Sequence, residues 1–431
     1  MASPTPLAAA KAAKGGTNVK RGRFARLAGS LGGSALLLGA SLVAASGVAA
    51  SSTTWYVSPT GTSGAAGTSC ATASFGTISA AVSAAAAGDT VVVCAGTYKE
   101  SVAVSKALTL TGQGVTIDAT GLDNGVKISA SNVTVTGFTV ENATGEGILA
   151  QQPNPVMGPM VGGQQLYTGV PLSHLTISHN VIKNNDQGGL PANVATTTYP
   201  ECKASGNIPG DCGEGIHLWS VANSSVTFNT VTDNVGGILL TDEFGPTHDN
   251  LIAGNVITDN IYDCGITLPS HNLGRDPASG KLMPSFGGVY NNVVRNNIST
   301  GNGGAGVGMF APFPGAASYN NTVEGNAISG NGEGGVSLHG HAPGAYVGGN
   351  SILDNIIGPN NLTGDQDLSP GPDLSTTGIV VWSAVTPITV TISGNTIFGS
   401  WYGIWLGHVV SAPGASARNT FWSISTRVHK A

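Results

Sequence analysis

The sequence predicts an all-β fold, a right-handed parallel β-helix of roughly nine or ten coils with an N-terminal capping helix. Two short patterns alternate along the chain. The first, Asn-x-(Ile/Val)-x-x-Asn, occupies 229–234 and 255–260, and the second, Gly-Ile-x-Leu, occupies 215–218, 237–240 and 265–268. The two Asn patterns start 26 residues apart (255 − 229). Self-similarity with such a period is typical of stacked repeats, here one coil each.

The Asn side chains of the first pattern have a structural explanation. A corner between strands requires a positive φ, which Asn and Gly tolerate. Asn amides stacked in successive coils can also hydrogen-bond to one another as a ladder. Further turns of this type begin at Asn180, Asn297, Asn326, Asn350 and Asn395. These residues are therefore given no functional role.

The first 50 residues predict a secretory signal peptide and hence a secreted protein. A basic segment ending in KRGRFAR precedes an apolar run over 27–48, and Val48-Ala49-Ala50 is a small-residue cleavage site. A membrane anchor is the alternative, because the run approaches the length that spans a bilayer. Six of the 17 Lys and Arg residues lie in this segment, so the mature chain carries (17 − 6) − 23 = −12. This acidic balance argues against a nucleic-acid partner.

The rest of the chain divides into an N-terminal cap segment, 51–107, and a β-helix, 108–431, with insertions lining one face. Residues 75–87 predict a helix that covers the open end of the stack. Its apolar face comprises Ile78, Ala81, Val82 and Ala85.

The five cysteines suggest disulfides in an exported chain. Proximity in the sequence pairs Cys70 with Cys94 and Cys202 with Cys212. Cys264 lies in a repeat strand and is expected to be a buried, apolar residue.

Insertions interrupt the coils, mostly after a Gly-Ile-x-Leu strand, so their loops are expected to form a wall along one edge. They occupy 153–170, 191–212, 272–287, 311–318, 342–348 and 358–375. In repeat proteins a face decorated in this way is usually the binding face.

The strands beside this wall can be aligned, because strand side chains alternate and the Ile and Leu of each pattern point inward. The first outward column comprises Leu149, His217, Leu239, Thr267, Gly308, Ser337, Val380 and Trp405. The second comprises Gln151, Trp219, Thr241, Pro269, Phe310, His339, Trp382 and Gly407.

Aromatic and polar side chains gather in these columns, as a sugar chain requires: flat apolar faces for stacking, with hydrogen-bonding groups between them. We therefore predict a substrate groove for polysaccharide. The alternative is that the insertions cover the tryptophans and that the histidines bond to loop backbone. The candidate substrate-binding residues are Trp219, Thr241, Thr267, Phe310, His339, His341, Trp382 and Trp405.

Carboxyl and imidazole groups beside the columns are candidates for catalysis. Glu214 and Asp263, two coils apart, could form the carboxyl pair of a glycoside hydrolase. Asp242 could orient the His271 imidazole as a general base. The full set of catalytic candidates is Asp242, Glu243, His271, His217, Glu214 and Asp263.

Alternatives to catalysis stay open for the same residues. Asp242, Glu243 and Asp263 could bind calcium, or the Thr-Asp-Glu run could cap the turn at 244–250. Scattered histidines, including His339-Gly340-His341, form no recognisable transition-metal set, so no metal site is assigned.

The chain resembles the right-handed β-helix superfamily of pectate-lyase-like and NosD-like proteins. The segment GDTVVVCAGTYKE, 88–100, is similar to the start of these domains, and the Asn and Gly-Ile repeats are similar to their coils. The resemblance covers about 54–425 and implies the fold, whereas many members act on polysaccharides and others have no assigned chemistry.

No catalytic set of that superfamily transfers to this chain. The Asp-Asp, Gly-His-Gly and Arg-x-Lys signatures of polygalacturonase-like enzymes are absent, as is the Asp-Pro-His motif of alginate epimerases. The columns also lack the Arg or Lys that pectate-lyase-like enzymes use, with only Arg275, Lys281 and Arg295 nearby.

The sequence thus predicts an exported, monomeric protein that binds polysaccharide, with cleavage by a lyase or hydrolase reaction and a calcium requirement left open. A non-catalytic extracellular or cell-surface binding rod is the alternative. A NosD-like accessory protein that handles metal is the third hypothesis.

Overall fold

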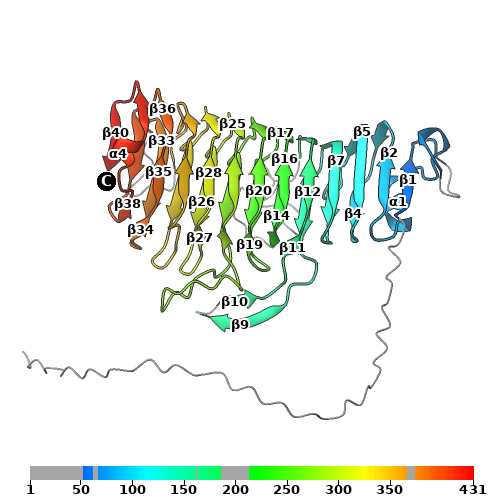
Figure 1. Ribbon diagram of the computed structural model, residues 1–431, viewed down its shortest axis with the longest axis horizontal. Helices are drawn as coiled ribbons and strands as arrows, with labels where there is room; N and C mark the ends of the chain where they lie inside the picture. The colour runs from blue at the N-terminus through cyan, green and yellow to red at the C-terminus, as the bar shows by residue number, and fades with distance from the viewer. Residues whose placement is uncertain (1–51, 62–66, 162–163, 186–212, 366–373) are drawn as a thin grey trace, which may run out of the picture. The chain divides into compact units, whose positions relative to one another are not determined.

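The parallel β-helix that the repeats predict is observed. The computed structural model describes residues 52–61, 67–161, 164–185, 213–365 and 374–431, and every statement below concerns these ranges. Figure 1 shows the strands as successive rungs, running from β1 to β40. The paired strands are parallel, apart from one antiparallel hairpin formed by β9 (Met157–Val161) and β10 (Gln164–Tyr167).

One sheet carries the predicted columns, and we call it the column sheet. It has eleven strands among the described residues. In order they are β4 (Val102–Val104), β6 (Val126–Ile128), β8 (Ile148–Gln151), β14 (Glu214–Trp219), β18 (Gly236–Thr241), β22 (Ile266–Pro269), β26 (Val307–Ala311), β30 (Val336–Gly340), β33 (Thr377–Ser383), β37 (Tyr402–Leu406) and β40 (Thr426–Lys430).

The other sheets complete the coils. A five-stranded sheet comprises β11 (Leu172–Ser173), β15 (Val221–Ala222), β19 (Thr247–His248), β23 (Val289–Tyr290) and β27 (Ser318–Tyr319). A twenty-stranded sheet comprises β1 (Thr54–Val57), β2 (Thr90–Val93), β3 (Gly96–Tyr98), β5 (Thr109–Asp118), β7 (Thr134–Glu141), β12 (Thr176–Ser178), β13 (Val181–Lys183), β16 (Ser225–Thr227), β17 (Thr230–Thr232), β20 (Leu251–Ala253), β21 (Val256–Thr258), β24 (Val293–Arg295), β25 (Ile298–Thr300), β28 (Thr322–Glu324), β29 (Ala327–Ser329), β31 (Ser351–Leu353), β32 (Ile356–Ile357), β35 (Thr391–Ser393), β36 (Thr396–Phe398) and β39 (Thr420–Trp422). The strands β34 (Ile388–Thr389) and β38 (Val410–Ser411) pair separately.

The Gly-Ile-x-Leu pattern is explained by packing inside the coils. Ile238 and Leu240 are fully buried in one continuous core, and the same holds for their counterparts in neighbouring coils. A Cβ at Gly237 would lie 2.1 Å from the carbonyl oxygen of Gly265 and 2.5 Å from Cγ2 of Ile257. Only glycine lets the backbones of adjacent coils approach this closely.

The predicted Asn ladder is confirmed. Asn229 donates from its backbone N and from Nδ2 to Oδ1 of Asn255, at 2.9 and 3.0 Å, and Asn255 does the same to Asn297. The ladder continues through Asn326, Asn355, Asn395 and Asn419. Every amide is thus paired inside the stack, as buried polar groups require.

Two details of that prediction are corrected. The positive φ belongs to the residue before the ladder Asn, as at Phe228 (57°) and Asn296 (54°), because that residue makes the corner. Asn350 belongs to a separate ladder, in which it accepts from Asn321, and it therefore marks a different corner from Asn326.

The N-terminal helix α1 (Ile78–Ala84) is shorter than the predicted 75–87. The predicted face is buried, with Ile78 and Ala81 fully covered, and α1 lies against β1, β2 and β4. The Glu100 carboxylate accepts hydrogen bonds from the backbone N of Ile78 (2.8 Å) and Ser79 (2.9 Å), so an anion sits at the start of the helix.

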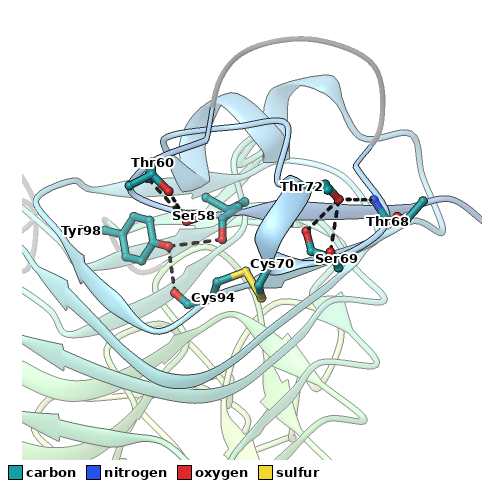
Figure 2. The surroundings of a disulfide bond; sticks show 9 residues. Ser58, Thr60, Thr68, Ser69, Cys70, Thr72, Cys94 and Tyr98 are labelled. Carbon is teal, nitrogen blue, oxygen red and sulfur yellow. Dashed lines mark hydrogen bonds between the residues drawn. A yellow bond between two sulfur atoms is a disulfide. The ribbon is translucent and has the colours of Figure 1, made fainter.

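The predicted Cys70–Cys94 disulfide is confirmed, and it joins the short helix η1 (Cys70–Thr72) to the end of β2 (Figure 2). The Tyr98 hydroxyl donates to the carbonyl oxygens of Cys94 (2.8 Å) and Val57 (3.3 Å) beside it. Cys264 is buried and free, as expected. The predicted Cys202–Cys212 pair lies outside the described residues.

The β9–β10 hairpin stands off from the stacked rungs in Figure 1, within the predicted insertion 153–170. A last helical turn, α4 (Ala415–Arg418), packs on β35 and β40. Within the described ranges, none of the helices has the length and hydropathy needed to cross a bilayer.

Candidate functional site

The two outward columns have the register that the sequence predicts. His217 pairs with Leu149 on one side and Leu239 on the other, and Trp219 pairs with Thr241. The same register continues through β26, β30, β33 and β37. One addition is needed: Lys127 pairs with Leu149, so a lysine extends the column in which no cation was expected.

The predicted exposure of the columns is wrong for most of their residues. Trp219 is only 2% exposed, and the other buried members of the columns include His217, Thr241, Thr267, His339 and Trp405. Only Phe310, His341 and Trp382 among the predicted contact residues remain partly exposed. Side chains on rungs less than 5 Å apart cover one another, and residues from the following turns add to this cover.

Trp219 shows how this burial arises. Its ring stacks on His217 (centroids 5.5 Å apart, 9° between planes) and on Phe244 (4.8 Å, 16°). Tyr167 of the β9–β10 hairpin meets Phe244 edge-on at 5.4 Å. The Trp219 Nε1 donor is buried within this stack and has no hydrogen-bond partner among the described residues, which is uncommon for a buried indole.

His217 is held from both sides. Its Nδ1 lies 3.4 Å from Oε1 of Glu146, and its Nε2 lies 2.9 Å from Oγ1 of Thr241. The other Glu146 oxygen accepts from the backbone N of Glu214 at 2.7 Å. Glu146 was not among the predicted site residues. The signal was present, because Gly-Glu-Gly-Ile occurs at both 145–148 and 213–216.

His271 is oriented by Glu243, with 2.8 Å between Nδ1 and Oε1. Burial acts to raise the pKa of Glu243, but the hydrogen bond and charge of His271, together with His217 and Thr241, outweigh it and hold the pKa below its ordinary value. The second carboxylate oxygen, Oε2, is buried and has no partner among the described residues.

Asp242 does not orient the His271 ring, which corrects the prediction. It is fully buried and accepts from Ser270 Oγ (2.9 Å) and from the backbone N atoms of His271, Asn272 (3.0 Å) and Gly288. Burial, followed by the nearby Glu243 charge, raises the pKa of Asp242 to about 7. Its contacts join both ends of the 272–287 insertion to β18, so Asp242 positions the loop that carries His271.

Glu214 and Asp263 meet across a glycine. A Cβ at Gly236 would lie 2.8 Å from Oε1 of Glu214 and 3.1 Å from Cβ of Asp263. Thr267 donates to Asp263 at 3.3 Å. The missing side chain at Gly236 therefore leaves room for two carboxyl groups from coils that are not adjacent.

Further along the column sheet, His339 forms a second imidazole–carboxylate pair. Its Nε2 lies 3.1 Å from Oδ2 of Asp365, and both side chains are completely buried. Phe310, His341 and Trp382 surround His339 with ring centroids 5.4–6.3 Å away. Asp365 was not predicted, because it lies in the 358–375 insertion and no repeat pattern marks it.

A family model described as "Right handed beta helix region" matches residues 119–272 and 169–411, which together cover most of the chain. The chain belongs to this right-handed β-helix family. No curated protein sequence matches it.

Several solved structures are similar to this chain. The A-module of the mannuronan C-5 epimerase AlgE4 from Azotobacter vinelandii has 16% identity and a TM-score of 0.47, over 82% of this chain and 94% of that module. An alginate lyase from Paenibacillus has 12% identity and a TM-score of 0.40, over 82% and 96%. Pectate lyase Pel9A has 12% identity and a TM-score of 0.37, over 87% and 78%. Similarity this distant carries no argument about what this chain binds.

The fold thus brings some of the predicted site residues close together. We call Glu146, His217, Thr241, Glu243 and His271 the imidazole–carboxylate network. Glu214 and Asp263 form a separate carboxyl pair beside it. The described residues contain no group of three or more His, Cys, Asp or Glu side chains arranged to hold a metal ion, so the suggested calcium ligands Asp242, Glu243 and Asp263 are not brought together in that way.

Proposed function

We propose that this β-helix protein is an exported protein that binds a polysaccharide along the column sheet and cleaves it by general acid–base chemistry at the imidazole–carboxylate network. One observation carries the proposal: two histidines, two rungs apart on the column sheet, are each held by a carboxylate, at 3.4 Å for His217 and 2.8 Å for His271. A carboxylate that fixes an imidazole sets its orientation and makes it a better base.

The network has the groups that cleavage requires. A glycosidic bond breaks when an acid gives a proton to the leaving oxygen while a base removes a proton, either from water or from the sugar ring. His271 and Glu243 are the least buried members of the network, with 8% and 13% of their side chains exposed. They are therefore the members that a substrate reaches first.

Phe310, His341 and Trp382 support binding of a chain rather than a single sugar. Their rings are partly exposed on the same sheet. The Trp382 strand lies three rungs from the β22 rung that leads to His271, or about 14 Å at the usual strand spacing. A polysaccharide lying along the stack can contact both regions.

Export is supported by the leader-like first 50 residues and by the Cys70–Cys94 disulfide. Disulfides persist in oxidising compartments and are rare in the cytosol.

The test incubates the purified protein with a panel of neutral, cationic and anionic polysaccharides, with and without calcium. New reducing ends and unsaturated products are followed together, since unsaturation marks elimination and reducing ends alone mark hydrolysis. We expect His271→Ala and Glu243→Gln to lose activity by at least about 100-fold while Tm is kept.

His248→Ala is the matched control, because His248 also pairs with a carboxylate (Asp249, 2.7 Å) but on the five-stranded sheet. Activity that survives both network substitutions would rule out this site. Equal losses in His248→Ala would show a general effect on folding instead.

A non-catalytic binding rod is the second candidate, and the burial of His217 and Trp219 favours it. It predicts polysaccharide binding with no product of either kind. Trp382→Ala then weakens binding by at least about 10-fold, because a partly exposed indole supplies stacking area.

A further inference from the structure

We infer that the glycan bound at this site carries amino groups and lacks carboxylates. The inference rests on the proposed function and names its substrate class.

Carboxylates crowd the site. Glu146, Glu214 and Glu243 lie on or beside the successive strands β8, β14 and β18, and Asp263 faces Glu214 across Gly236. Four carboxyl groups thus lie in or beside the network: Glu146 and Glu243 contact His217 and His271, and the Glu214–Asp263 pair lies next to Glu146.

Cations are scarce among the described residues near this group. Lys127 lies in the first column, two rungs from His217, or about 10 Å at strand spacing. Arg275 bonds the Gly280 carbonyl and stacks over Tyr346, and Lys183 pairs with Glu141. A uronate carboxylate placed here would meet like charges in a site of low exposure, where they repel strongly.

An independent observation shows which ligand atoms the site can accept. Trp219 is 2% exposed, and its ring lies between those of His217 and Phe244. Its buried Nε1 donor has no hydrogen-bond partner among the described residues. The Glu243 Oε2 acceptor is buried without a partner as well. A hydroxyl oxygen of a sugar satisfies the indole donor. An ammonium group, which has three donors and no acceptor, satisfies the carboxylates.

The charge of the glycan also determines which cleavage reaction is available. β-Elimination needs a ring proton acidified by the uronate carboxyl group, and an amino-sugar polymer has none. Cleavage of such a polymer is therefore hydrolysis. Water bonds to the anomeric carbon and gives a proton to the base, while the acid's proton goes to the leaving glycosidic oxygen.

The experiment compares oligosaccharides of equal length that differ in charge. The purified protein is titrated calorimetrically with β-1,4-linked glucosamine oligomers, with the same oligomers fully N-acetylated, and with polyuronate oligomers of equal length. We expect the amino form to bind at least 10-fold more tightly than the N-acetylated form, and the polyuronate not to bind. Raising the salt concentration should weaken only the amino form.

Variants separate site binding from general attraction to an acidic protein. Glu243→Gln should reduce the preference for the amino form at least 5-fold. Glu324→Gln, on β28 of the twenty-stranded sheet, should leave it unchanged. Equal effects of both variants, equal binding of both glucosamine forms, or tighter binding of polyuronate would each overturn the inference.

The outcomes also separate the inference from the proposed function. Polyuronate binding at the site would leave the proposed function standing and overturn the inference alone. Failure of all three ligand classes to bind would remove both.

Discussion

Asp242 and Glu243 are sequence neighbours with opposite environments. Asp242 points into the protein, where burial raises its pKa to about 7. Glu243 faces two histidines, which hold its pKa below the ordinary value although burial opposes them. Both residues lie just after the end of β18, where the chain turns, and there one carboxyl group anchors a loop while the other joins the network.

The raised pKa of Asp242 predicts a pH dependence of stability. The folded state holds the Asp242 proton more tightly than the unfolded state, in which the pKa of this group is near the ordinary aspartate value of 3.8. The contribution of this group to stability therefore falls as pH rises from about 4 to about 7, and is constant above that.

Asp242→Asn tests this expectation. The amide should destabilise the fold at pH 5, because its N–H group faces the backbone donors of His271, Asn272 and Gly288. The difference in free energy of unfolding between Asp242→Asn and the natural protein should decrease by more than about 1 kcal/mol between pH 5 and pH 8. Chemical denaturation at both pH values measures it. A gap that widens with pH would mean that the Asp242 carboxylate is stabilised in the folded protein.

At the scale of elements, the Asn ladder fixes the stacking of the coils. Asn255 accepts two hydrogen bonds from Asn229 and donates to Asn297 and to the Val226 carbonyl. Each rung therefore fixes the next one through side chains as well as through the sheet.

Asn255→Ala should destabilise the protein by about 3 kcal/mol, because it removes the partner of the buried Asn229 backbone N–H and of the Val226 carbonyl. Thr258→Ala is the control on the same turn of the coil, since the Thr258 hydroxyl makes one weak hydrogen bond among the described residues, 3.4 Å to Thr232. Denaturant midpoints compare the two variants. Similar small losses in both would show that the ladder adds little to stability.

At the scale of the whole molecule, the repeats form one compact unit over 51–431. The Cys70–Cys94 disulfide closes a segment of 24 residues at its N-terminal end. A disulfide that closes a loop of this size stabilises the folded protein by about 3 kcal/mol relative to its reduced form.

The expected processing follows from the first 50 residues. When the full chain is expressed in a bacterium, mass spectrometry of the extracellular fraction should find a mature protein that begins at Ser51. Its Cys70 and Cys94 should resist alkylation until a reductant is added, while denatured Cys264 reacts without one. A protein retained in the membrane with residues 1–50 attached would support the anchor instead.

Much of the architecture could be predicted because it depends on local periodicity. The repeat of about 26 residues predicts the coils, and the alternation in Gly-Ile-x-Leu gives the register that pairs His217 with Leu239 and His339 with Trp382. The apolar face of α1 and the Cys70–Cys94 pair follow from spacing alone.

The site depended on tertiary structure for two physical reasons. Hydrogen-bond partners on different rungs depend on how each turn directs its side chains, so the sequence assigned the His271 ring to Asp242 rather than Glu243 and did not single out Glu146 or Asp365. Exposure depends on what packs over a residue, as Phe244 does over Trp219. The sequence by itself determined the fold and the residues that share a face, because these follow from backbone period. Only the folded chain decided which carboxylate holds which histidine, because that depends on distances across coils.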